Sequence, residues 1–84
     1  MPNAAIRLSR MAIAYTEHAL SRMRCRRITK SEVEGAISFP YFTVPSRIGR
    51  FFAVQKHGDK YLKVIYEKSN NKITVITVYW TRRP

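Results

Sequence analysis

One histidine and four arginines lie within ten residues of this chain, from His18 to Arg27. Thr16 stands just before them and can cap the start of a helix. On such a helix, His18, Arg22 and Arg26 recur every four residues and form one stripe, while the apolar residues of the segment fall on the other side. Histidine titrates near neutral pH, and arginine binds phosphate through two parallel hydrogen bonds. The stripe therefore points to phosphate binding, with proton transfer as a further capability.

RNA cleavage without a metal would use these residue types. RNA supplies its own nucleophile, the 2′-hydroxyl, and the protein must supply a proton acceptor, a proton donor and cations that stabilise the reacting phosphate. We expect His18 as acid or base, Arg22 and Arg26 as the cationic clamp, and Tyr79 as a further catalytic candidate from the sheet. Additional nucleic-acid contacts are expected from Arg24, Arg27, Lys30, Arg50, Lys56, Lys63 and Thr77. The plainer alternative is a solvated helix face, although like charges four residues apart repel and a bound polyanion would offset that repulsion.

The charge of the whole chain supports a polyanionic partner. Sixteen lysines and arginines stand against five acids, which gives a net charge of +11. Nucleic acid is the commonest partner for such a surface, and an acidic protein or an anionic membrane is the alternative. No apolar run is long enough for a membrane span. The single Cys25 excludes an internal disulfide and fits a reducing cytoplasm.

Several chemistries have little support in the sequence. The five acids are scattered, so no carboxylate cluster for a two-metal nuclease is expected. One cysteine and two separated histidines do not make a structural zinc site. The three glycines lie far apart, so no glycine-rich phosphate loop is expected. The sequence therefore predicts neither a metal nor a cofactor.

Two helices are expected in the first half of the chain. The first begins after Thr16 and ends at Arg26 or Arg27, and the second begins at a capping box formed by Thr29 and Glu32. Val33, Ala36 and Ile37 give the second helix its apolar side. Residues 1–10 are interpreted as a loosely ordered extension, Met11 as a candidate natural start, and residues 11–84 as a single domain. Residues 11–15 are either a short strand or the lead-in to the first helix.

The second half shows the alternation that is typical of strands. Strands are expected over 41–44, 47–56, 61–68 and 73–80, with turns at 57–59 and 70–71. The last strand is apolar or β-branched on both sides, which predicts burial of both its faces. The expected fold is α+β, with two N-terminal helices packed on a four-stranded antiparallel sheet.

The helical half also carries a family resemblance. Residues 15–37 (YTEHALSRMRCRRITKSEVEGAI) resemble an uncharacterised prokaryotic family whose motif begins His-Ala-x-x-Arg-Met-x-x-Arg-Gly-Ile. Together with the paired strands at the C-terminus, the resemblance covers roughly residues 11–80. This family is distantly similar to the RelE, ParE and BrnT toxins and to small metal-independent ribonucleases, which have the same order of helices and strands.

The resemblance implies a cytoplasmic toxin of a toxin–antitoxin system that cleaves RNA, including mRNA on the ribosome, and is held by an acidic antitoxin. It supports His18, Arg22 and Arg26, and to a lesser degree Thr77 and Tyr79, as site residues. Two alternatives remain: a non-catalytic RNA- or ribosome-binding module, and a ParE-like toxin that acts by protein contact. One departure stands out, because Arg27 occupies the position where the family has glycine. A left-handed backbone there would cost arginine about 1 kcal/mol relative to glycine.

Overall fold

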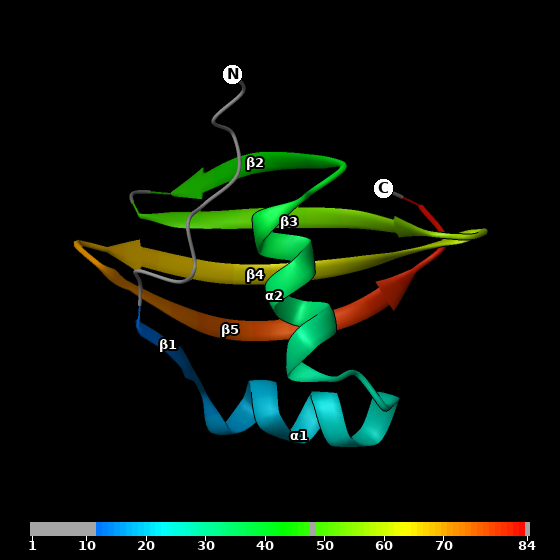
Figure 1. Ribbon diagram of the computed structural model, residues 1–84, viewed down its shortest axis with the longest axis horizontal. Helices are drawn as coiled ribbons and strands as arrows, with labels where there is room; N and C mark the ends of the chain where they lie inside the picture. Colours follow the sequence, from blue (N-terminus) through cyan, green and yellow to red (C-terminus); the bar gives the residue numbers. More distant parts are fainter. Residues whose placement is uncertain (1–11, 48, 84) are drawn as a thin grey trace.

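The computed structural model describes residues 12–47 and 49–83. Within these residues the chain forms two helices and five strands, in the order strand, two helices, four strands (Figure 1). The predicted N-terminal extension, residues 1–10, lies outside the described residues. The elements are β1 (Ala12–Tyr15), α1 (Glu17–Arg26), α2 (Lys30–Ser38), β2 (Phe42–Arg47), β3 (Arg50–His57), β4 (Lys60–Ser69) and β5 (Lys72–Thr81).

The described strands form one mixed sheet in the order β1-β5-β4-β3-β2. The prediction of a four-stranded antiparallel sheet is therefore wrong, although the α+β class holds. The difference comes from residues 12–15, which form a fifth strand that pairs in parallel with the first half of β5. The other neighbouring strands are antiparallel. At the opposite edge of the sheet, β2 continues through Pro45 to Arg47. Proline is tolerated in an edge strand because the N–H donor that it lacks is not needed on the side that faces solvent.

Both helices begin where the sequence predicts. The Thr16 side chain accepts a hydrogen bond from the Ala19 N–H at 3.0 Å, and Thr29 and Glu32 form a reciprocal capping box. Thr16 also fixes α1 to the sheet, since its hydroxyl donates to the Ile76 carbonyl at 2.8 Å. These contacts attach the start of α1 to the middle of β5.

The end of α1 is a turn that contains a left-handed residue. Arg27 has φ 57° and ψ 46°, and the Ile28 N–H donates to the Met23 carbonyl at 2.8 Å. This hydrogen bond, together with the one from the Arg27 N–H to the Arg24 carbonyl, is the Schellman pattern in which glycine is the preferred left-handed residue. Met23 and Ile28 are both buried, which supplies the apolar contact that accompanies this motif. The chain therefore makes the turn with an arginine where glycine is the less strained choice.

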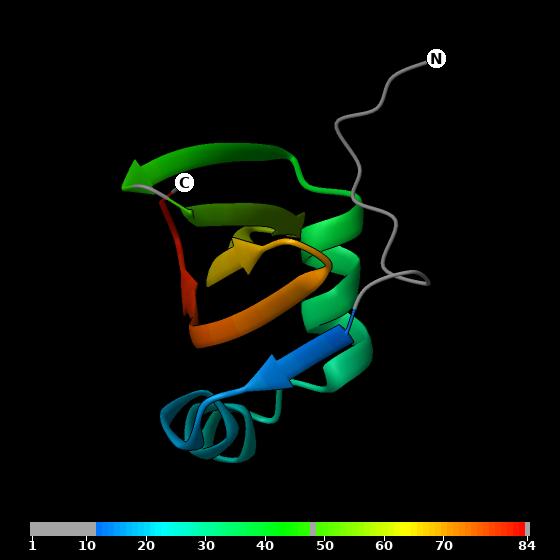
Figure 2. The same cartoon turned by 90° about the vertical axis from the view of Figure 1, so that its left-hand side faces the viewer.

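The hydrophobic core lies between the helices and one face of the sheet. Figure 2 shows α2 against one side of the sheet and α1 along its lower edge, next to β5. The largest buried side chains include Ile37 from α2, Leu62 and Val64 from β4, and Ile73 and Val75 from β5. The alternation of β4 is confirmed, with Leu62, Val64 and Tyr66 buried and the residues between them half-buried.

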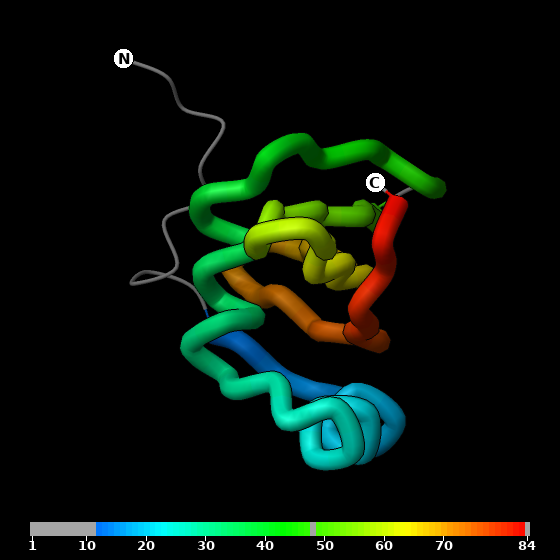
Figure 3. Tube along the Cα trace, turned by 90° about the vertical axis from the view of Figure 1, so that its right-hand side faces the viewer, coloured from blue at the N-terminus to red at the C-terminus, as the bar shows by residue number. Residues whose placement is uncertain are grey.

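The last strand is bent rather than buried on both faces. A bulge in the pairing of β4 with β5 places Ile76 between the partners of Ile65 and Tyr66. Beyond it, the second half of β5 turns sharply, as the red segment of Figure 3 shows. Ile73, Val75 and Val78 are buried, but Thr74, Thr77 and Tyr79 are only half-buried, so the predicted burial of both faces is wrong. The second face of β5 is therefore partly exposed.

Candidate nucleic-acid interface

The sheet face opposite the core is not covered by either described helix (Figure 2). We call it the open face. Directly paired residues of neighbouring strands point to the same face of a sheet, so the register defines which side chains lie there. Its central row runs from β5 to β2 through Tyr79, Lys63, Val54 and Phe42. Val54 in this row is fully buried by its neighbours, and the other three residues are half-buried. The next row runs through Thr77, Ile65, Phe52 and Val44.

Lys63 lies at the centre of the open face, between aromatic rings. Its Nζ atom is 5.8 Å from the ring centroid of Phe52 and 5.8 Å from that of Tyr79. Both distances are within the range of cation–π attraction, which holds the ammonium group over the sheet. The Lys63 ammonium group and the Tyr79 ring thus lie side by side on the open face, where both side chains are half-buried.

A second group lies at the end of β4 next to the β3–β4 turn. Tyr61 is paired with Thr81 on one side and with Lys56 on the other. The ring of Tyr41, which immediately precedes β2, is 6.1 Å from the ring of Tyr61. This end of the open face therefore also combines aromatic rings with a lysine, and Lys56 is exposed.

Arg50 lies at the other end of the open face and already has a partner. Its Nε and Nη2 atoms donate to one carboxylate oxygen of Glu67, at 3.1 Å and 2.5 Å. Its positive charge is therefore neutralised by a residue of the same face. A phosphate could bind Arg50 only in competition with this carboxylate.

The arginine stripe lies on α1 and not on the open face. His18, Arg22 and Arg26 are all exposed on α1. α1 packs against β5, the strand that carries Tyr79 and Thr77 (Figure 1). In the part of the chain that the structure describes, no hydrogen bond or ion pair joins the stripe to the open face.

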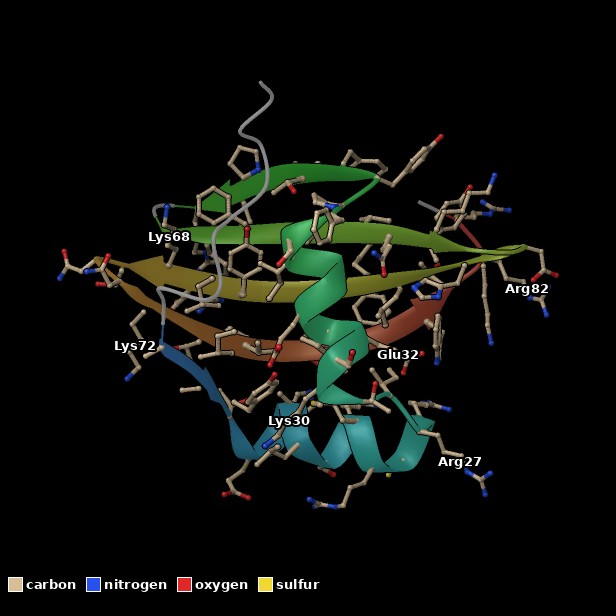
Figure 4. The ribbon with its side chains drawn as sticks, viewed as in Figure 1. Arg27, Lys30, Glu32, Lys68, Lys72 and Arg82 are labelled. Atoms are coloured by element: carbon tan, nitrogen blue, oxygen red, sulfur yellow. The ribbon has the colours of Figure 1, made fainter. Side chains whose placement is uncertain are left out.

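Three further predicted cations lie on or next to the helices. Arg24 is exposed in the last turn of α1. Arg27, at the end of α1, points away from the body of the domain in Figure 4. Lys30 begins α2, and its Nζ lies 5.3 Å from the ring centroid of Tyr15. These three residues extend the positive surface of the helical half but do not join the open face.

Tyr15 is held beneath Lys30 as part of the helix packing. Its hydroxyl donates to the Glu34 carboxylate at 3.3 Å. Burial, and then the nearby negative charge of Glu34, raise the pKa of Tyr15 to about 12. The phenol therefore stays protonated at neutral pH, and the Tyr15–Glu34 pair has a structural role.

Sequence reasoning missed the apolar half of the open face. Phe42, Val44, Phe52 and Val54 lie on the same face as Lys63, along β2 and β3. The segment Phe51–Val54 is apolar throughout, so its alternation is hidden, and only pairing with β4 separates the two sides. Tyr66, whose polar hydroxyl made it resemble the other strand tyrosines, is buried in the core at 2 % exposure.

The described residues also bear on two other functions, metal binding and membrane insertion. Across residues 12–47 and 49–83, no group of three or more His, Cys, Asp or Glu side chains could hold a metal ion. Within the same ranges, neither helix has the length and apolar character needed to cross a membrane.

The chain was compared with known proteins at three levels. Neither the curated proteins nor the solved structures include a match to this chain. One family model does match, and it covers residues 15–80, which include both helices, the open face and the arginine stripe. The chain therefore belongs to the family described as a domain of unknown function, DUF4258.

Proposed function

We propose that this domain is a metal-independent ribonuclease of the toxin type, which cleaves RNA through the 2′-hydroxyl of its substrate. The observation that carries the proposal is the pair Lys63 and Tyr79, which lie half-buried on the sheet face that neither described helix covers. The stripe His18, Arg22 and Arg26 lies on α1, which packs against β5. This combination provides cations for a phosphate together with groups that can exchange protons.

Each group has a chemical role in the proposed reaction. The 2′-hydroxyl loses its proton and attacks the adjacent phosphorus, and the bond to the 5′-oxygen of the next nucleotide breaks. Lys63, Arg22 and Arg26 stabilise the negative charge that accumulates on the phosphate oxygens. His18 and Tyr79 are the candidates for accepting the first proton and for supplying one to the departing oxygen. The products are a 2′,3′-cyclic phosphate and a free 5′-hydroxyl.

The charge of the domain also supports a partner protein. A net charge of +11 would be neutralised by an acidic antitoxin that covers the basic surface. RNA, including ribosome-bound mRNA, is the proposed substrate, and the cytoplasm is the proposed location because both RNA and ribosomes are found there. A non-catalytic RNA-binding module is the second candidate, because exposed rings and lysines on a sheet suffice for RNA binding.

The test combines expression in cells with cleavage by the purified protein in EDTA. The proposal predicts growth arrest and RNA fragments that form without divalent metal. Growth arrest without RNA cuts would favour a toxin that acts by protein contact, and RNA binding without cleavage or toxicity would favour the non-catalytic module. Either result would contradict the ribonuclease proposal.

Variants then test the assigned residues. Lys63→Ala and Tyr79→Phe should each reduce cleavage by about 100-fold, in line with the usual contributions of a charge-stabilising group and a general acid. Lys72→Ala is the matched control, because Lys72 lies at the start of β5 near the β4–β5 turn (Figure 4) and should leave cleavage unchanged. Undiminished cleavage by His18→Ala would show that His18 takes no part in the reaction. Undiminished cleavage by Lys63→Ala would show that the open face is not the site of cleavage.

A further inference from the structure

Three aromatic rings form a partly exposed step where β2 begins, and we call Tyr41, Phe42 and Tyr61 the aromatic step. The ring centroid of Tyr41 is 5.7 Å from that of Phe42 and 6.1 Å from that of Tyr61. Tyr41 is 62 % exposed, although aromatic side chains are more often covered in a folded domain. The step therefore presents aromatic surface to solvent rather than to the core.

The step is fixed in place by the backbone. The Tyr41 N–H donates to the Val54 carbonyl at 2.6 Å, which attaches this residue to the end of the sheet. Tyr61 lies within β4 and is only half-buried. The rings are thus carried by ordered backbone, so a ligand that stacks on them need not order a loose loop first.

The surroundings of the step are mostly positive, since the nearby carboxylate of Asp59 is paired with Arg82 at 3.6 Å. Lys56 lies directly opposite Tyr61 on β3, and Lys63 follows Tyr61 by two residues on the same face. Glu67 is the one carboxylate that the register places on the described part of the open face, and it is paired with Arg50. Aromatic faces next to lysine side chains are complementary to a nucleic acid whose bases are not base-paired, because the rings stack on the bases and the lysines contact the phosphates.

We infer that the open face takes single-stranded RNA, with a base stacked on the aromatic step while the adjoining phosphates contact Lys56 and Lys63. The inference rests on RNA being the ligand, as proposed above, and it adds that the bases must be unpaired. In a duplex the base faces are stacked on one another, and only backbone and groove edges are offered to the protein. Exposed tyrosine rings would then find no partner.

The experiment measures the affinity of the full chain for a short fluorescein-labelled single-stranded RNA and for the duplex of the same sequence, over a range of salt concentrations. The single strand should bind at least tenfold more tightly than the duplex. Tyr41→Ala should weaken single-strand binding by about tenfold, as expected for loss of one stacked base, and Tyr41→Phe should bind like the wild type. Phe39→Ala is the control, because Phe39 is 74 % exposed but lies at the end of α2.

The salt dependence separates stacking from charge. Tyr41→Ala should leave the slope of log affinity against log salt unchanged, whereas Lys63→Ala should reduce it by about 0.7 because one phosphate contact of a single strand is lost. Equal RNA affinity of Tyr41→Ala and the wild type would overturn the inference and favour a protein partner for the step. Absence of cleavage with these binding results intact would refute the ribonuclease proposal alone, and absence of RNA binding by the wild type would refute both.

Discussion

Replacing Arg27 with glycine should stabilise the domain. Arg27 is the left-handed residue of the turn that ends α1, with φ 57° and ψ 46°. A residue with a β-carbon pays roughly 1–2 kcal/mol in this region of backbone conformation. Glycine removes that strain, but it also raises the entropy of the unfolded chain by the equivalent of about 0.5–1 kcal/mol. The net gain expected for Arg27→Gly is therefore about 1 kcal/mol.

The assay is thermal unfolding followed by circular dichroism. For a domain of this size, 1 kcal/mol corresponds to an increase in Tm of roughly 4–8 °C. Arg27→Ala is the control, since alanine also removes the positive charge beside Arg24 and Arg26 but keeps the β-carbon. An equal increase in both variants would show that charge relief is responsible, and an unchanged or lower Tm for Arg27→Gly would refute the argument from backbone strain.

Three further results are expected. Gln55→Glu should lower stability by about 1–2 kcal/mol in thermal unfolding, because the Gln55 amide donates to two carbonyls at the end of α2 and a carboxylate would oppose them. Between about pH 10 and pH 12 the wild type should lose more stability than Tyr15→Phe. The folded state holds the Tyr15 proton up to a pKa of about 12, whereas the unfolded chain releases it near 10. Parallel pH curves would contradict this. Glu67→Gln should free Arg50 and strengthen RNA binding, with a salt slope steeper by about 0.7, and unchanged binding would show that Arg50 faces no phosphate.

Local sequence signals predicted the helices and the order of the last four strands. The caps at Thr16 and Thr29 and the turn at Asn70, whose φ is 53°, depend on residues that are close together in the chain. The first strand could not be settled in this way. Its four residues become a strand because they pair in parallel with β5, sixty residues further along the chain, and short apolar segments carry no signal of such a partner.

The candidate site was predictable only where it depends on local sequence signals. Lys63 alternates with Leu62 and Val64, so its place on the face opposite the core was present in the sequence. The last strand was predicted to be buried on both faces, so only its pairing with β4 places Tyr79 beside Lys63. The apolar residues Phe42 and Phe52 joined that face only through strand pairing. Tyr66 follows the buried positions Leu62 and Val64 at intervals of two, so its place in the core was present in the pattern but was outweighed by its polar hydroxyl.

The central claim is that the RNA supplies the nucleophile and the domain supplies the cations and the proton transfer. The most direct measurement compares two otherwise identical RNA oligonucleotides in EDTA, one of them carrying a 2′-deoxy nucleotide at the position where cleavage occurs. The account predicts fragments with 2′,3′-cyclic phosphate ends from the all-ribose RNA and no cut at the deoxy position. Cleavage at the deoxy position, or fragments that form only when a divalent metal is added, would contradict it.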